Sequence, residues 1–74
     1  MHDLDVTLWV GKGGIDDAVI DELDTQFDDR DAVKVRILRS ARSEGTVEER
    51  AQTLATAVDG VVVDTRGHTA VIAR

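Results

Sequence analysis

The sequence predicts an α/β protein, more closely an α+β two-layer sandwich with the order β-α-β-α-β-β, a four-stranded mixed sheet and two helices on one face. Short segments alternate between apolar and polar residues, two longer segments repeat apolar residues every three or four positions, and glycines separate several of them. Strands joined through a helix favour parallel pairing, whereas a short final turn makes the last pair antiparallel. With 74 residues, the chain 1–74 is expected to be a single domain.

The first half of the chain predicts a strand followed by a helix. Residues 6–10 alternate as a strand does, and the run Gly11-Lys12-Gly13-Gly14 interrupts them. Asp16 is a suitable N-cap for a helix over 16–28. The apolar face of that helix is formed by residues four positions apart, namely Ile15, Val19, Leu23 and Phe27.

The second half predicts the other four elements. Aliphatic residues at 33, 35 and 37 alternate with Lys34 and Arg36, which indicates a second strand. After a loop at 40–45, residues 46–49 form a capping box that opens a helix, and Gly60 is expected at its C′ position. A third strand at 61–63, a hairpin turn at 66–67 and a fourth strand at 69–73 complete the sheet.

The composition excludes several classes of function. The chain has no cysteine and two histidines, so neither a disulfide, a metal site nor another cofactor is expected. No segment approaches the roughly 20 apolar residues of a membrane span, and the short acidic N-terminus is unlike a signal peptide. We therefore expect a cytoplasmic protein without a membrane partner.

The charge composition is unusual. There are 15 acidic and 9 basic residues, giving a net charge of −6, which by itself opposes binding to nucleic acid. Aspartate dominates the acids and lysine is scarce among the bases, a composition suited to a halophilic protein in concentrated salt. At about 1 M salt the Debye length falls to about 3 Å, so only contacts at close range decide binding.

Local charge is unevenly distributed. Residues 15–31 are strongly acidic, whereas 33–43 carry bases and no acid. If the aliphatic residues of the second strand face the helices, Lys34 and Arg36 must point to the opposite, open face of the sheet. The acidic helix face and the basic sheet face would then lie on different sides of the molecule.

The run Gly11-Lys12-Gly13-Gly14 is the strongest candidate site. Glycines allow a ligand to approach the backbone closely, a helix N-terminus adds N–H donors, and Lys12 adds a positive charge. KH domains hold a nucleic-acid backbone with a Gly-x-x-Gly loop of this kind. The alternative is a connection that only needs flexibility. The run is not a P-loop, since the Gly-Lys-Ser/Thr ending is absent.

Other candidate residues lie on the strands and at the last turn. Trp9 is expected on the open face, either stacking on a base or covering apolar surface. Lys34 and Arg36 either contact phosphates or form a solvated strand face. A basic hairpin tip, or an ordinary polar turn, is formed by Arg66, Gly67 and His68.

No catalytic site is indicated. His68 could act as a general base only beside a nucleophile or an orienting carboxylate. Asp64 is near it in sequence, but no nucleophile stands out. We therefore do not expect an enzyme.

Three segments resemble the YhbY-like, or CRM (chloroplast RNA splicing and ribosome maturation), RNA-binding domain. They are the run 8–22 with Val-Gly-Lys-Gly-Gly-Ile leading into a helix, the strand 32–37, and the C-terminal hairpin 64–74. The resemblance extends over residues 6–74. This sequence differs from the family in three respects. Bacterial members begin with a basic helix before the first strand, where this sequence has five residues; Ala73 stands where an aromatic residue is frequent; and the usual basic surface is diluted by acidic residues.

The resemblance implies a fold similar to the C-terminal domain of translation initiation factor 3 and binding to structured RNA, in ribosome assembly or group II intron splicing. It also implies that the glycine loop and the hairpin residues Gly67 and His68 take part. The resulting hypothesis is a non-catalytic, monomeric RNA-binding domain that contacts ribosomal or precursor RNA, and through it ribosomal particles. The alternative is a protein-interaction module that uses the acidic helix face.

Overall fold

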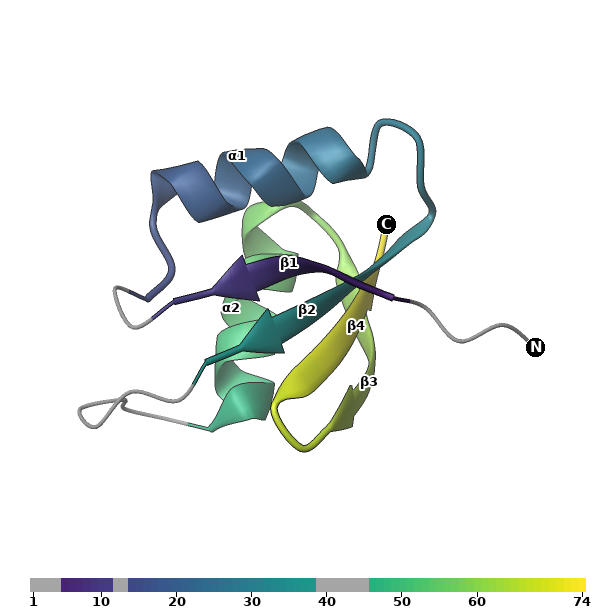
Figure 1. Cartoon of the computed structure of the whole chain (residues 1–74). Coiled ribbons are helices and arrows are strands. Elements are labelled where there is room, and N and C mark those ends of the chain that lie inside the picture. Colours follow the sequence, from purple (N-terminus) through teal and green to yellow (C-terminus); the bar gives the residue numbers. More distant parts are fainter. Residues whose placement is uncertain (1–4, 12–13, 39–45) are drawn as a thin grey trace.

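Six elements follow one another in the predicted order, in a computed structural model that describes residues 5–11, 14–38 and 46–74. Predictions for Lys12, Gly13 and the loop at 40–45 lie outside the described residues. The elements are β1 (Val6–Val10), α1 (Asp17–Gln26), β2 (Ala32–Ile37), α2 (Val47–Ala57), β3 (Val61–Arg66) and β4 (Thr69–Ala73) (Figure 1). β3 is twice as long as the predicted strand at 61–63, because its polar second half pairs with β4.

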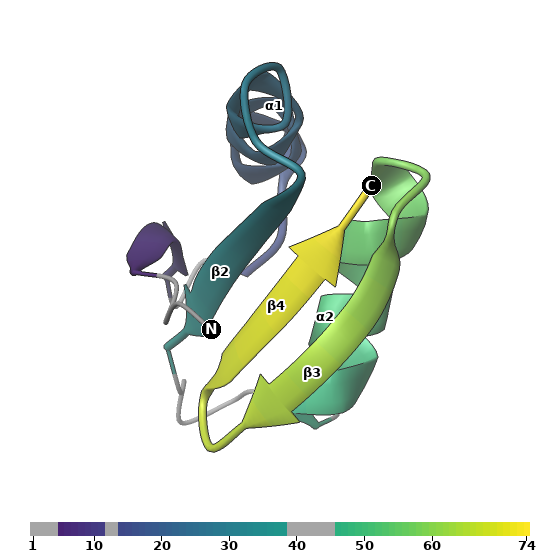
Figure 2. The same cartoon turned by 90° about the vertical axis from the view of Figure 1, so that its right-hand side faces the viewer.

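The four strands form one mixed sheet in the order β1-β2-β4-β3 (Figures 1 and 2). β1 and β2 are parallel, as expected for strands joined through α1, and β4 is antiparallel to both of its neighbours. The parallel pairing places the C-terminal ends of β1 and β2 at the same end of the sheet. β4 begins at this end, because Arg36 near the end of β2 pairs with Thr69 at the start of β4.

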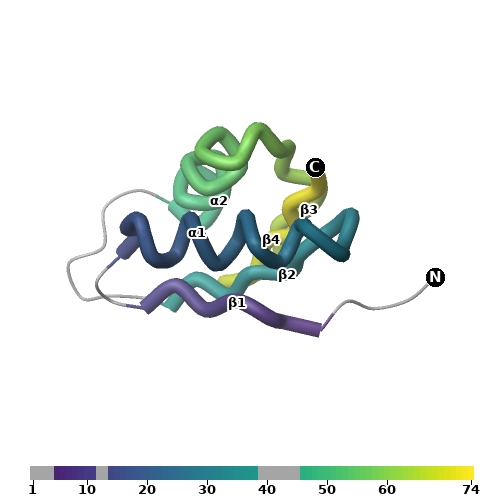
Figure 3. The backbone as a smooth tube through the Cα atoms, turned by 90° about the horizontal axis from the view of Figure 1, so that it is seen from above, coloured from purple at the N-terminus to yellow at the C-terminus, as the bar shows by residue number. Residues whose placement is uncertain are grey.

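Both helices cover the same face of the sheet (Figure 3). The core between the layers is entirely apolar, and its largest fully buried side chains come from both helices and three of the strands: Leu23, Leu54, Ile72, Val10, Val33 and Val35. Burying such side chains is the main stabilising contribution in a domain of this size. The opposite, open face of the sheet has no helix among the described residues to cover it.

Side-chain caps begin both helices. At α1, the backbone N–H of Val19 donates to the Asp16 carboxylate over 3.0 Å. At α2, the Thr46 hydroxyl accepts from the Glu49 N–H, and the Glu49 carboxylate accepts from the Thr46 N–H, so the predicted capping box is formed.

The end of α2 differs from the prediction that Gly60 occupies the C′ position. Asp59 takes the left-handed conformation, with a φ of 59°, and the Gly60 N–H donates to the Ala55 carbonyl in the 6→1 pattern of a Schellman motif. Gly60 is needed for another reason. A Cβ there would lie 2.6 Å from the Ala73 carbonyl oxygen, so the chain passes too close to β4 for any other residue.

Two register shifts interrupt the simple alternation of the edge strands. β1 shifts between Val6 and Leu8, which places Val6 opposite Lys34. The side chain of Thr7 instead hydrogen-bonds Gln26 of α1. Val6 therefore shares the face of Lys34 and Trp9, whereas strict alternation predicts that it faces away from Trp9. In β3 the shift lies between Val62 and Asp64.

Candidate nucleic-acid interface

The glycine turn after β1 is described at its two ends, Gly11 and Gly14. The Gly14 N–H donates to the Gly11 carbonyl over 2.9 Å, which closes a four-residue turn between β1 and α1. Gly14 has a φ of 84°, a conformation that strongly favours glycine. Gly11 has no such φ, and a Cβ added to it would meet nothing within 4 Å. The fold therefore requires a glycine at position 14 and not at position 11.

The N-terminus of α1 follows this turn, but its donors are already partly used. The Asp16 carboxylate accepts the Val19 N–H, and exposed Asp17 adds a second negative charge in the first turn. An incoming phosphate would gain from the helix dipole and lose from these carboxylates. The start of α1 by itself is therefore a poor site for an anion.

The glycine turn and the hairpin tip lie at the same end of the sheet, on either side of the last residues of β2. The Leu38 N–H donates to the Val10 carbonyl over 2.9 Å, and the Ile37 N–H donates to the His68 carbonyl over 2.7 Å. Because neighbouring strands are about 4.8 Å apart, the start of the glycine turn after β1 and the end of the hairpin tip before β4 are roughly 10 Å apart. Two regions that are more than fifty residues apart in sequence thus lie at the same end of the sheet, with the end of β2 between them (Figure 1).

The hairpin tip is a two-residue turn of Gly67 and His68, one position later than the predicted turn at 66–67. Gly67 has a φ of 58°, and no positive φ occurs at His68, a pattern typical of the type II′ turns that join antiparallel strands. The turn leaves Arg66 as the last residue of β3, opposite Thr69. Both residues of the tip, and the side chain of Arg66, are exposed.

One cross-strand row on the open face joins three of the predicted residues, Trp9, Arg36 and Arg66. Trp9 pairs with Arg36, Arg36 with Thr69, and Thr69 with Arg66, so one side chain from each strand points to the same side. This set of four is called the cross-strand row below. Trp9 is 55% exposed, which confirms that it points away from the core, between buried Leu8 and Val10.

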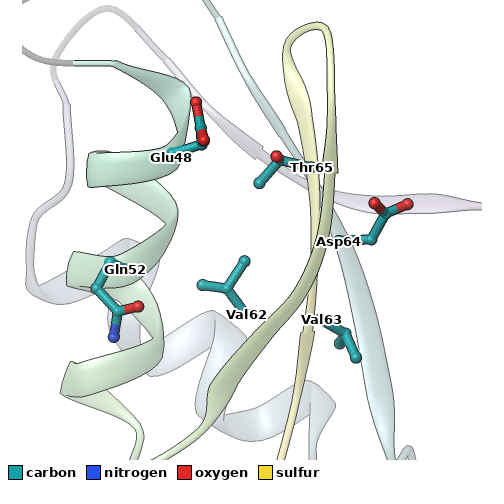
Figure 4. Close-up of a pocket in the computed structure, with 6 residues that line it drawn as sticks. All are labelled: Glu48, Gln52, Val62, Val63, Asp64 and Thr65. Atoms are coloured by element: carbon teal, nitrogen blue, oxygen red, sulfur yellow. The ribbon is translucent and has the colours of Figure 1, made fainter.

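A second set of paired residues lies farther from the turns. Lys34 is half-buried and pairs with Val71, which in turn pairs with Asp64. Asp64 brings an acid onto the open face, which charge patterning along the sequence did not indicate. Figure 4 shows Asp64 directed to the side of β3 away from α2, so the open face is basic near the turns and less so beyond them.

Not every basic residue near the sheet belongs to this surface. Arg74 forms an ion pair with Asp24 of α1, and its guanidinium lies 5.0 Å from the centre of the Phe27 ring. It is thereby tied to the helix layer. Within the described residues, no carboxylate forms an ion pair with Lys34, Arg36 or Arg66, so these charges are available to a ligand.

The exposed acids of α1 form a separate surface. α1 covers the core face of the sheet, so its solvent side lies away from the open face (Figure 3). Exposed carboxylates on and just after the helix include those of Asp17, Asp21, Asp24 and Asp28. The predicted separation of an acidic helix side from a basic sheet side is thus present.

A shallow pocket of about 390 Å³ lies between α2 and β3, away from the glycine turn (Figure 4). Glu48 and Gln52 line it from the helix, and Val62 and Thr65 point into it from the strand. It contains none of the predicted site residues. In the parts of the chain that the structure describes, no three His, Cys, Asp or Glu side chains gather as metal ligands do, and neither helix is long and apolar enough to cross a membrane.

Thr69 and Asp64 are members of the open face that the sequence did not identify. Thr69 could have been found by placing the turn at Gly67-His68, which makes Arg66 and Thr69 partners. The position of Asp64 on the open face depends on the register shift in β3, which the sequence does not indicate.

The whole chain matches one family model, that of the CRS1/YhbY (CRM) domain, over residues 1–74. This chain belongs to the CRS1/YhbY (CRM) domain family. It is 39% identical over 67 residues to the protein of Methanocaldococcus jannaschii named "Probable RNA-binding protein MJ0652", covering 90% of this chain. The chain spans about half, 49%, of the length of that curated relative.

A solved structure also supports membership of the CRS1/YhbY (CRM) domain family. The solution structure of the Staphylococcus aureus protein SAV1595, described as a candidate RNA-binding protein, superposes with a TM-score of 0.81 and 32% identity. The match covers 99% of this chain and 74% of that one. The predicted CRM-type fold, an α+β sandwich with a four-stranded mixed sheet and two helices, is thereby confirmed.

Proposed function

We propose that this CRM domain is a non-catalytic RNA-binding domain that holds the backbone of structured RNA at the glycine turn. Two of its relatives are named for RNA binding. The observation that carries the proposal is that the turn at Gly11–Gly14, the hairpin tip and the cross-strand row all lie towards the same end of the sheet.

In this proposal the residues divide by role. Backbone amides of the turn and the Lys12 ammonium hold phosphate or sugar at close range, and Gly13 lets the RNA approach. Lys34, Arg36 and Arg66 contact neighbouring phosphates, and Trp9 lies next to Arg36 on the same face. Gly67 and His68 form a second contact about 10 Å away across the sheet.

The acidic composition is compatible with this role if the protein works in concentrated salt. Short directed hydrogen bonds to backbone amides persist at about 1 M salt, where charges separated by more than about 3 Å are screened. We accordingly infer a cytoplasmic protein of a halophile, acting as a monomer on ribosomal or precursor RNA during ribosome assembly or RNA processing.

Gly11 offers the sharpest test of the turn. Its φ is not restricted to glycine and a Cβ there meets nothing, so Gly11→Ala should leave the free energy of unfolding within about 0.5 kcal/mol of wild type. If RNA lies against this backbone, the added methyl group should weaken binding to a structured RNA in molar KCl about 10-fold, and Lys12→Asp should weaken it further.

Matched controls make the result interpretable. Asp21→Lys, on the solvent side of α1, should not weaken RNA binding, whereas it should disrupt a protein partner held by the acidic helix face. Equal RNA affinity of wild type, Gly11→Ala and Lys12→Asp would contradict binding at the turn. Loss of a protein partner on Asp21→Lys, with no RNA bound by wild type, would favour the protein-interaction module instead.

A further inference from the structure

The cross-strand row combines an exposed aromatic ring with two cations that form no ion pair with the described residues, all along one line. Trp9 stands at the β1 end, Arg36 is next to it, and Arg66 is at the β3 end. With strands about 4.8 Å apart, the row runs roughly 15 Å at right angles to the strands. Thr69, between the two arginines, donates its hydroxyl proton to the Arg66 carbonyl over 2.8 Å and does not block the line.

Trp9 is the aromatic member of the exposed large hydrophobic residues among those the structure describes. More than half of the side chain is exposed, while its strand neighbours Leu8 and Val10 fill the core. A tryptophan that covered apolar sheet surface would itself be largely buried. A large aromatic side chain in solvent beside cations is the arrangement with which proteins hold single-stranded nucleic acid, by base stacking and phosphate contacts.

The indole ring of Trp9 can stack on an unpaired base more readily than on a base within a duplex. In an A-form duplex each base is stacked on both sides, so a tryptophan on a sheet surface cannot reach its π-face without unstacking it. Sequence-tolerant stacking on side chains is instead made by bases in loops, bulges and single-stranded ends. The chemistry of Trp9 therefore favours an RNA in which at least one base is unpaired.

We propose that the cross-strand row binds an unpaired RNA segment that adjoins the structured region held at the glycine turn. The RNA segment runs across the sheet from β1 towards β3. One of its bases stacks on Trp9, and its phosphates contact Arg36 and Arg66. This inference rests on the proposed RNA-binding function and adds the class of ligand: a junction between structured and single-stranded RNA, rather than a continuous duplex.

Trp9 provides its own probe, because it is the only tryptophan and the chain has no tyrosine. An RNA hairpin whose loop is replaced by a non-nucleotide linker is prepared with a six-nucleotide single-stranded tail and with a blunt end, so that only the tail supplies unpaired bases. Both forms are titrated into the wild-type protein in molar KCl. The tailed hairpin should quench Trp9 fluorescence and bind on the order of 10-fold more tightly than the blunt one.

Variants separate stacking from general binding. Trp9→Ala should reduce affinity for the tailed hairpin on the order of 10-fold and leave the blunt hairpin unchanged, and Trp9→Phe should restore part of the loss. Val63→Ala, which removes exposed apolar surface from β3 outside the row, should change neither. Matching far-ultraviolet circular dichroism of each variant establishes that it is folded.

Two contrary outcomes distinguish the unpaired-segment inference from the proposed RNA-binding function. Equal binding of tailed and blunt hairpins, with no effect of Trp9→Ala but a loss on Lys12→Asp, overturns the unpaired-segment inference and leaves RNA binding in place. Failure of the wild-type protein to bind either hairpin or a pool of total cellular RNA overturns both.

Discussion

The two faces of the sheet use adjacent residues for opposite purposes, as Val35 and Arg36 on β2 illustrate. Val35 is fully buried beneath the helices, whereas Arg36 is exposed in the cross-strand row. The same contrast holds on β1 for Val10 and Trp9. Stability and ligand binding are thus separated by the alternation of strand side chains, so substitutions one position apart should affect different measurements.

The largest effect on stability is expected in the core. Leu54 is fully buried and Leu38 is 41% exposed, so the same Leu→Ala change can be compared at both. Leu54→Ala should lower the free energy of unfolding by about 2–5 kcal/mol through lost burial and a cavity. Leu38→Ala should lower it by less than about 0.5 kcal/mol. Urea denaturation followed by circular dichroism measures both, and similar losses would contradict the assignment of the two positions.

The largest effect on binding is expected in the cross-strand row. Arg36→Glu removes a cation that forms no ion pair within the described chain, so it should weaken RNA binding by about 2 kcal/mol, or roughly 30-fold. Unfolding should be nearly unchanged. Arg30→Glu, an exposed arginine between α1 and β2, makes the same change in net charge. Filter-binding titrations in which both variants lose affinity equally would show that only net charge matters.

Arg74 sharpens the comparison because it is a base that belongs to the helix layer. Arg74→Ala removes the ion pair with Asp24 and the contact with the Phe27 ring. Both partners are partly exposed, so the loss of stability should be modest, about 0.5–1 kcal/mol. RNA affinity should stay within about 2-fold of wild type. A loss as great as that of Arg36→Glu would instead place Arg74 at the RNA contact.

The smallest effect is expected at Asp16, where helix capping and RNA binding oppose each other. Asp16→Asn keeps a good N-cap for α1 and removes a negative charge beside the glycine turn. Stability should change by less than about 0.5 kcal/mol, and RNA affinity should rise a few-fold. Paired measurements of unfolding and RNA affinity check this, and unchanged or weaker binding would argue against a phosphate near the helix start.

The sequence predicted the features that depend on neighbouring residues. Alternation placed Lys34 and Arg36 opposite the core, and side-chain chemistry identified the caps Asp16 and Thr46. What it could not supply depends on contacts between distant segments. The ion pair between Arg74 and Asp24 joins residues fifty positions apart, which no local sequence pattern indicates.

Contacts between distant segments also decide the role of Gly60 and the alignment of the cross-strand row. Glycine at position 60 suggested a left-handed C′ residue, whereas the approach of β4 explains it and Asp59 adopts that conformation. The cross-strand row follows from the strand order β1-β2-β4-β3, which brings Trp9 and Arg66 into one line. Individual candidates could be chosen from the sequence, but their alignment required the sheet.

The surface that RNA occupies can be mapped directly by titrating a tailed RNA hairpin into isotopically labelled protein and following amide and indole chemical shifts by NMR. RNA at the proposed interface predicts the largest changes at Gly11, Gly14, the Trp9 indole, Arg36 and the tip Gly67–His68. Small changes are expected over α1 from Asp17 to Asp24. Changes concentrated on α1, or in the pocket between α2 and β3, with the glycine turn unaffected, would contradict the account.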